Sequence, residues 1–139
     1  MARPRGETGL SARRLVLDSG AVIALSRGET RARAFVARAR ELSVPVEIPV
    51  VAVAETIRGG PRDAPVHRVL KAVGTVPPAG ERHGRTAGRL LGAARSTSTV
   101  DALVVAQAIE GGGAVVLTGD PDDLRRLAVD HPEVRVERL

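Results

Sequence analysis

Four carboxylates in this sequence stand where their side chains are able to do chemistry together: Asp18, Glu55, Asp101 and Asp120. Like charges held close together repel one another unless a cation lies among them. Oxygen ligands without cysteine or histidine favour a hard divalent ion, Mg²⁺ or Mn²⁺. Such an ion activates water, polarises a phosphoryl oxygen and stabilises a leaving alkoxide. The predicted chemistry is therefore metal-dependent hydrolysis of a phosphodiester.

The first and the last of these acids each come at the end of an apolar run. Asp18 directly follows residues 15–17, and Asp120 follows residues 114–117 across a short Thr-Gly turn. Continuous apolar runs of this kind are typical of strands in a parallel sheet that helices cover on both faces. Ligands of open α/β sheets collect at the carboxyl ends of the strands. If the two strands are neighbours, we expect these two side chains to converge there.

The two middle acids are predicted to lie on helices. Asp101 opens a helix over residues 99–111, and helical spacing points it away from the other polar side chains of that helix, so it faces inward. Glu55 lies in residues 50–58, an almost entirely apolar helical segment. A carboxylate on such a segment needs a partner.

Each acid also has an ordinary structural interpretation. Asp18 can cap the helix behind it, Asp101 can close a capping box with Ser98, and Glu55 can pair with Arg58 one turn on. The fourth acid can cap the helix that follows it. These alternatives stay open for any single residue, whereas four such acids together favour a metal site.

Further polar residues crowd the same two strand ends. Ser19 and Thr118 can orient a carboxylate or hold a phosphate oxygen, although turn and capping roles also explain them. Asp122 and Asp123 can bind a second ion or an ion-bound water. First-turn acids are common in helices, so these two remain outside the core set.

Strands and helices alternate through the whole chain. Strands are predicted over residues 15–17, 44–49, 75–76, 114–117 and 134–136, and helices over residues 21–25, 29–42, 50–58, 65–74, 80–94, 99–111 and from 121 onward. This alternation predicts an α/β fold, with a central, mostly parallel sheet of four to five strands between helical layers. We expect one domain over residues 1–139 with residues 1–13 as a loosely ordered lead-in, and residues 59–65 form either an ordered turn or a flexible rim.

Composition limits the class of protein and of partner. The formal net charge is +5, and Lys71 is the single basic residue that is not arginine, which favours a polyanionic partner held through its phosphates. Phe35 is the one aromatic residue, which argues against binding of single strands by base stacking. No cysteine is present, and no apolar run is long enough to span a bilayer or to form a signal peptide. We therefore expect a cytoplasmic protein without a membrane partner.

The acidic segments together resemble the ordered motifs of PIN-domain ribonucleases, most closely the VapC toxins of bacterial type II toxin-antitoxin systems. The segments are residues 17–19, 53–56, 99–106 and 117–124. The resemblance implies a PIN-like three-layer α/β/α fold and a Mg²⁺-dependent endoribonuclease that acts on structured RNA such as tRNA or rRNA. It also implies that the four acids hold the metal and perform catalysis, that the chain forms a homodimer, and that a VapB-like antitoxin blocks the site.

Other phosphate-handling folds fit less well. A phosphotransfer receiver domain needs an acidic pair on the first strand, whereas Asp18 is solitary. A haloacid-dehalogenase-like phosphatase needs a second aspartate two residues later, where Gly20 stands. The glycine fingerprint of a dinucleotide-binding fold is absent after the first strand. The remaining alternative is a catalytically silent PIN-like module that binds RNA or a protein partner.

Overall fold

A computed structural model of the chain describes residues 14–139, and the predicted lead-in over residues 1–13 lies outside the described residues. In this part of the chain, four parallel strands form one sheet in the order β2-β1-β3-β4. The strands are β1 (Leu15–Leu17), β2 (Val46–Glu47), β3 (Ala114–Thr118) and β4 (Val134–Arg138). This sheet confirms the predicted α/β class and parallel topology.

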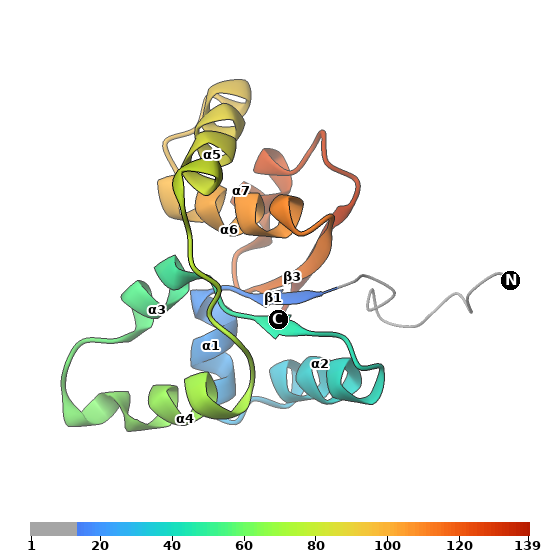
Figure 1. Cartoon of the computed structure of the whole chain (residues 1–139). Helices are drawn as coiled ribbons and strands as arrows, with labels where there is room; N and C mark the ends of the chain where they lie inside the picture. Colours follow the sequence, from blue (N-terminus) through green and yellow to red (C-terminus); the bar gives the residue numbers. More distant parts are fainter. Residues whose placement is uncertain (1–13) are drawn as a thin grey trace, which may run out of the picture.

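Helices cover both faces of the sheet. One layer holds α1 (Ser19–Ser26), α2 (Thr30–Glu41), α3 (Val50–Thr56) and α4 (Ala64–Ala72), with a 3-10 turn η1 (Pro61–Asp63) before α4. The other layer holds α5 (Glu81–Ala94), α6 (Thr99–Glu110) and α7 (Pro121–Leu127). Figure 1 shows α1, α2 and α4 below the sheet, α3 beside its edge, and α5, α6 and α7 above it. The molecule therefore has the three-layer α/β/α architecture that the sequence predicts.

Alternation along the strands divides the core into two halves. Leu15 and Leu17 of β1 pack with α1 and α2, whereas Val16 between them packs with α6 and α7. Val116 of β3 lies on the same side as Val16. Because successive strand residues point to opposite faces, one short strand anchors both helical layers. The buried strands β1 and β3 thereby fix the positions of the chain segments that follow them.

The predicted fifth strand is reduced to a single bridge. Thr75 pairs with Glu47 at the edge of β2, and the chain then leaves the sheet. Two prolines, Pro77 and Pro78, follow at once and cannot donate to a ladder. The strand predicted over residues 44–49 is also shorter, since β2 covers only Val46–Glu47 and Pro49 caps α3.

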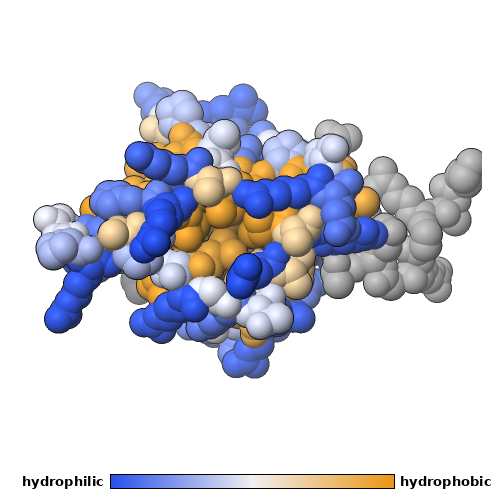
Figure 2. Space-filling view, turned by 90° about the horizontal axis from the view of Figure 1, so that it is seen from below, coloured by the Kyte–Doolittle hydropathy of each residue, from blue (hydrophilic) through white to orange (hydrophobic). Residues whose placement is uncertain are grey.

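The surface of the lower helical layer is mixed in character. Figure 2 shows apolar side chains in its centre, surrounded by hydrophilic ones. Partly buried apolar residues that pack against the core on this side of the sheet include Leu25, Val53, Ile57, Leu70 and Val73. In residues 14–139, no helix is both long enough and apolar enough to cross a membrane.

Candidate active site

The carboxyl ends of β1 and β3 lie side by side and carry the first predicted site residue. The Asp18 backbone N–H donates to the Leu117 carbonyl at 3.2 Å, which continues the ladder one residue beyond the end of β1. Asp18 is also the N-cap of α1, because its Oδ1 accepts from the Ala21 N–H at 3.0 Å. The capping interpretation of this acid is therefore confirmed, and its half-buried carboxylate has one oxygen engaged in the cap.

The turn after β3 brings a second acid to the same edge. The Thr118 side chain is fully buried, and its Oγ1 accepts from the Asp120 backbone N–H at 3.0 Å. Asp120 itself is exposed and makes no side-chain cap to α7, so its carboxylate stays available. Gly20 allows this turn to approach α1, since a Cβ there would lie 3.1 Å from the Gly119 nitrogen.

The third acid lies in the first turn of α6. Asp101 is half-buried, and Ser98 at the N-cap makes no side-chain cap, so the predicted alternative of a capping box does not form. A carboxylate in the first turn is favoured by the helix dipole. α6 packs against α3 and β3, and its first turn lines the same pocket as the ends of β1 and β3.

The fourth acid, Glu55 on α3, is exposed. In the part of the chain that the structure describes, its carboxylate has no hydrogen bond or ion pair, and the predicted alternative of a pair with Arg58 is not made. Arg58 instead donates to the carbonyls of Ala54 and Ile57, at 3.0 and 3.1 Å. Glu55 is therefore positioned by its helix alone.

The segment after α3 is an ordered turn. The buried carboxylate of Asp63 accepts from the backbone N–H groups of Arg58 and Gly59, at 3.0 and 2.7 Å. The Gly59 hydrogen bond is the main reason that the pKa of Asp63 lies below its ordinary value. This ionised side chain fixes the path of the chain that leaves the helix carrying Glu55.

All four predicted acids line one pocket of about 600 Å³. Its other lining residues are glycines, hydroxyl-bearing residues and one valine: Ser19, Gly20, Thr97, Ser98, Thr99, Val100, Thr118 and Gly119. No arginine, lysine or histidine lines it. Of the secondary candidates, Ser19 and Thr118 belong to this pocket, whereas Asp122 and Asp123 lie outside its lining.

Burial and negative charge act together on two of the acids. Burial and the charges of Asp123, Asp18, Asp120 and Glu55 together raise the pKa of Asp101 to about 6, and burial has the largest effect. Burial likewise raises the pKa of Asp18, while hydrogen bonding with Thr118 and with the backbone lowers it. The pocket therefore holds excess negative charge, and its lining has no basic side chain to balance that charge.

The donor chemistry of the pocket fits a hard divalent ion, because carboxylate and hydroxyl oxygens are what such ions bind. The arrangement is nevertheless looser than the tight cluster predicted from the sequence. Among residues 14–139, no three histidine, cysteine, aspartate or glutamate side chains form a group that could hold a metal ion. Repulsion among unpaired carboxylates opposes a closer approach. Mg²⁺ is commonly held by one or two carboxylates and several waters, so the oxygen donors still suit it.

The sequence interpretation missed the hydroxyl side of the pocket. Thr97, Ser98 and Thr99 line the pocket, and the sequence interpretation includes only Ser98, as a helix cap. The available signal was the run of four hydroxyl residues, 96–99, directly before the helix that carries Asp101. Such side chains are able to donate hydrogen bonds to phosphate oxygens without adding charge.

The chain is similar in sequence to one protein family and in fold to several solved structures. The family model described as PIN domain matches residues 15–130, and no curated protein sequence matches the chain. Two similar solved structures each have a TM-score of 0.64. One is VapBC2 from Rickettsia felis bound to a DNA fragment from its promoter, with 12% identity over 90% of this chain and 98% of that chain. The other is a toxin-antitoxin complex from Klebsiella pneumoniae, with 18% identity over 86% of this chain and 94% of that chain. At these identities, the similarity shows a shared fold.

Proposed function

The chain belongs to the PIN domain family, and from this premise we propose that it is a divalent-metal-dependent endoribonuclease. One observation carries the proposal: four carboxylates from four separate segments line a single pocket that contains no basic side chain. Carboxylates gathered in one pocket without a basic partner repel one another, and a bound cation would remove that repulsion. The pocket also lies at the carboxyl ends of parallel strands, where open α/β sheets bind ligands.

In this proposal Asp18, Glu55, Asp101 and Asp120 hold the metal. When bound, the ion supplies Lewis-acid chemistry, which makes water a better nucleophile and stabilises charge on the leaving oxygen. The cap that Asp18 makes to Ala21 fixes one carboxylate oxygen, and Thr118 ties the Asp120 backbone to the end of β3. These contacts preorganise two of the acids before substrate arrives.

We propose structured RNA, such as tRNA or rRNA, as the substrate. The surplus of arginine suits a polyanion, because a guanidinium matches phosphate oxygens in geometry and charge. The absence of basic side chains from the pocket lining implies that arginines outside it attract the RNA, while the hydroxyls of residues 97–99 contact the phosphate at the reacting bond.

We further propose that the chain is a VapC-type toxin with a VapB-like antitoxin, and that it forms a homodimer. The support is that both similar structures are toxin-antitoxin complexes by their own descriptions. The apolar surface of the lower helical layer, in the centre of Figure 2, is suited to contact with a second protein.

A catalytically silent PIN-like module that binds RNA or a partner is the second candidate. The observation that favours it is that, over residues 14–139, no three acidic or imidazole side chains form a ready group for a metal. The two candidates predict different outcomes in one assay, because a silent module binds RNA without cutting it.

That assay is cleavage of total tRNA and rRNA by the purified chain, with Mg²⁺ or with EDTA, followed by mapping of the cut ends. We expect discrete cuts that EDTA abolishes and that Asp18→Asn or Asp101→Asn reduces by roughly a hundredfold or more. Glu41→Gln, an exposed carboxylate on α2 outside the pocket, is the control that should cut normally. Cutting retained by both aspartate variants would exclude this site, and RNA binding without any cutting would support the silent module.

A further inference from the structure

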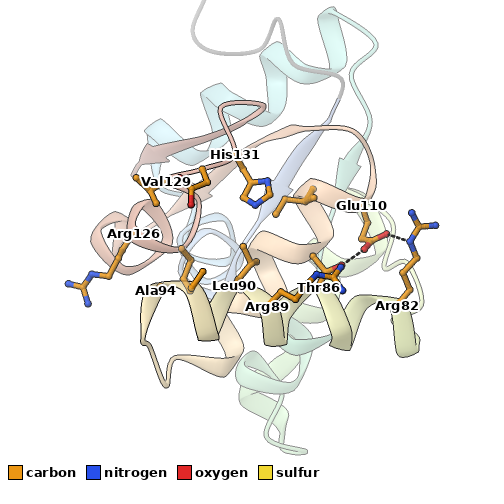
Figure 3. A pocket seen from close by; sticks show the side chains of 13 residues that line it. Arg82, Thr86, Arg89, Leu90, Ala94, Glu110, Arg126, Val129 and His131 are labelled. Atoms are coloured by element: carbon orange, nitrogen blue, oxygen red, sulfur yellow. Dashed lines mark hydrogen bonds and ion pairs between the residues drawn. The ribbon is translucent and has the colours of Figure 1, made fainter.

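A second cavity, of about 450 Å³, lies in the upper helical layer. It forms a groove between α5 and the segment from α7 to His131, and the last turn of α6 contributes Ile109 and Glu110 (Figure 3). Its lining shares no residue with that of the carboxylate pocket. We call it the α5–α7 groove, and nothing in the proposed nuclease chemistry uses it.

Aliphatic side chains contribute much of the groove lining. Leu90 of α5, Ile109 of α6 and Leu127 of α7 line it together with Val129. Val129 is 76% exposed, the most exposed of the large hydrophobic residues in the described part of the chain. An aliphatic side chain left in water beside a concave apolar lining is typical of a surface that another molecule covers.

The charges of the groove leave positive groups without full compensation. Glu110 is already engaged, because Arg82 approaches it at 2.8 Å and the Thr86 hydroxyl donates to it at 2.5 Å. Figure 3 shows both contacts at one end of the groove. Arg89 has only the Thr86 hydroxyl, at 3.3 Å, and no carboxylate lies within ion-pair distance of it among residues 14–139.

The opposite wall of the groove carries a second weakly paired cation. Arg126 lies 4.0 Å from Asp123 and is 65% exposed. Asp130 is exposed and is the one carboxylate of the lining with no ion pair in the described chain. The groove lining therefore carries one guanidinium group without a carboxylate partner, Arg89, and one that is weakly paired, Arg126, beside one unpaired carboxylate.

We propose that the α5–α7 groove docks a short acidic segment of a partner protein. Aliphatic side chains of that segment occupy the floor beside Leu90 and Val129, and its carboxylates pair with Arg89 and Arg126. The groove follows α5 from Arg82 to Ala94, which at 1.5 Å per residue is about 18 Å, the length of five or six extended residues. The proposal does not depend on the nuclease activity, since the two pockets have separate linings.

Nucleic acid fits this groove less well than an acidic peptide does. The groove has no phenylalanine, tyrosine or tryptophan ring on which a base could stack, because Phe35 is buried on α2 in the other helical layer and His131 is the single imidazole of the lining. The aliphatic floor contributes nothing to contacts with a sugar-phosphate backbone. A peptide can use both the floor and the arginines.

The test uses the full chain and three fluorescent probes: a short peptide of alternating leucine and glutamate, the same peptide with lysine in place of glutamate, and a short single-stranded RNA. Fluorescence anisotropy gives the affinities, and methyl NMR signals of Leu90, Leu127 and Val129 locate the contact. We expect the acidic peptide to bind and to shift these methyl signals, with the lysine peptide at least about tenfold weaker.

Variants separate specific docking from general attraction. Replacing Arg89 and Arg126 by glutamine should weaken the acidic peptide about tenfold, and Val129→Ser should weaken it about threefold. Asp130→Asn should strengthen it. The matched control is Arg85→Gln, an exposed arginine of α5 that pairs with Glu81 outside the groove and should change nothing. Equal binding of both peptides, equal effects of Arg85→Gln and Arg89→Gln, or methyl shifts caused by RNA alone would each overturn the proposal.

Discussion

At the scale of single residues, Asp101 shows most clearly how burial and neighbouring charges change the pKa of an acid in the candidate site. Its carboxyl group is half-buried, and four neighbouring acids raise its pKa on top of the effect of burial, from an ordinary 3.8 to about 6. A group with a raised pKa binds a proton more tightly in the folded protein than in the unfolded one. The ionised form is therefore the unfavourable one in the folded state, and a bound cation would reverse that preference.

A dependence of stability on pH follows from the sign of this shift. Between about pH 4 and pH 6 the folded protein holds more protons than the unfolded chain, so its free energy of unfolding falls as pH rises through this window. Allowing for solvent screening, the loss is about 1 to 2 kcal/mol. We expect Asp101→Asn to reduce this slope, to which the raised pKa of Asp18 contributes in the same direction, and to raise the melting temperature at pH 7 in EDTA. Thermal unfolding measured at several pH values checks this, and an unchanged slope in the variant would contradict the assignment.

At the scale of elements, two glycines in helices have opposite roles. A Cβ at Gly20 in the first turn of α1 would press on the turn that carries Asp120, whereas a Cβ at Gly88 in the middle of α5 meets nothing within 4 Å. Alanine is the better helix former by about 1 kcal/mol. The same substitution should therefore affect the site at one position and only the helix at the other.

We expect Gly88→Ala to raise the free energy of unfolding by about 0.5 to 1 kcal/mol and to leave Mg²⁺ affinity unchanged. Gly20→Ala should lower Mg²⁺ affinity about tenfold, because Gly119 must move and takes the neighbouring acid with it. Denaturant unfolding and calorimetric titration measure the two quantities. Unaltered Mg²⁺ binding by Gly20→Ala would show that the close approach of α1 to this turn does not shape the site.

At the scale of the whole molecule, Arg14 joins three elements at the end of the sheet opposite the carboxylate pocket. Its guanidinium pairs with Glu47 of β2 and donates to the Gln107 and Ala108 carbonyls of α6, at 3.0 and 2.7 Å. Gly111 makes room for it, since a Cβ there would lie 2.0 Å from the guanidinium carbon. The side chains of the ion pair are only 11% and 18% exposed.

Removing this arginine should destabilise the fold strongly. Arg14→Ala leaves the Glu47 carboxylate without its ion pair in a poorly solvated place, and we expect a loss of about 3 kcal/mol in the free energy of unfolding. Arg85→Ala, which breaks the exposed pair with Glu81 on α5, should cost less than about 0.5 kcal/mol. Urea unfolding of both variants measures the difference, and equal losses would show that burial of the Arg14 pair carries no extra free energy.

The residues that the sequence placed correctly are those governed by local pattern. Apolar runs predicted β1 and β3, and the position of Asp18 and Asp120 after them predicted that these acids share one edge of the sheet. The tightness of the acidic cluster was not predictable, because it depends on how far repulsion separates side chains on different elements. The contacts of Arg14 with β2 and α6 were also not predictable, since its partners lie 33 to 94 residues away along the chain.

The central claim is that the four carboxylates of one pocket hold a divalent ion. Its most direct test is titration of the isotope-labelled full chain with Mn²⁺, which broadens the NMR signals of nearby amides. We predict selective broadening at Gly20, Val100 and Gly119, competition by Mg²⁺, and loss of the effect in Asp18→Asn. Broadening centred on acidic residues elsewhere, or none at all at these three amides, would contradict the account.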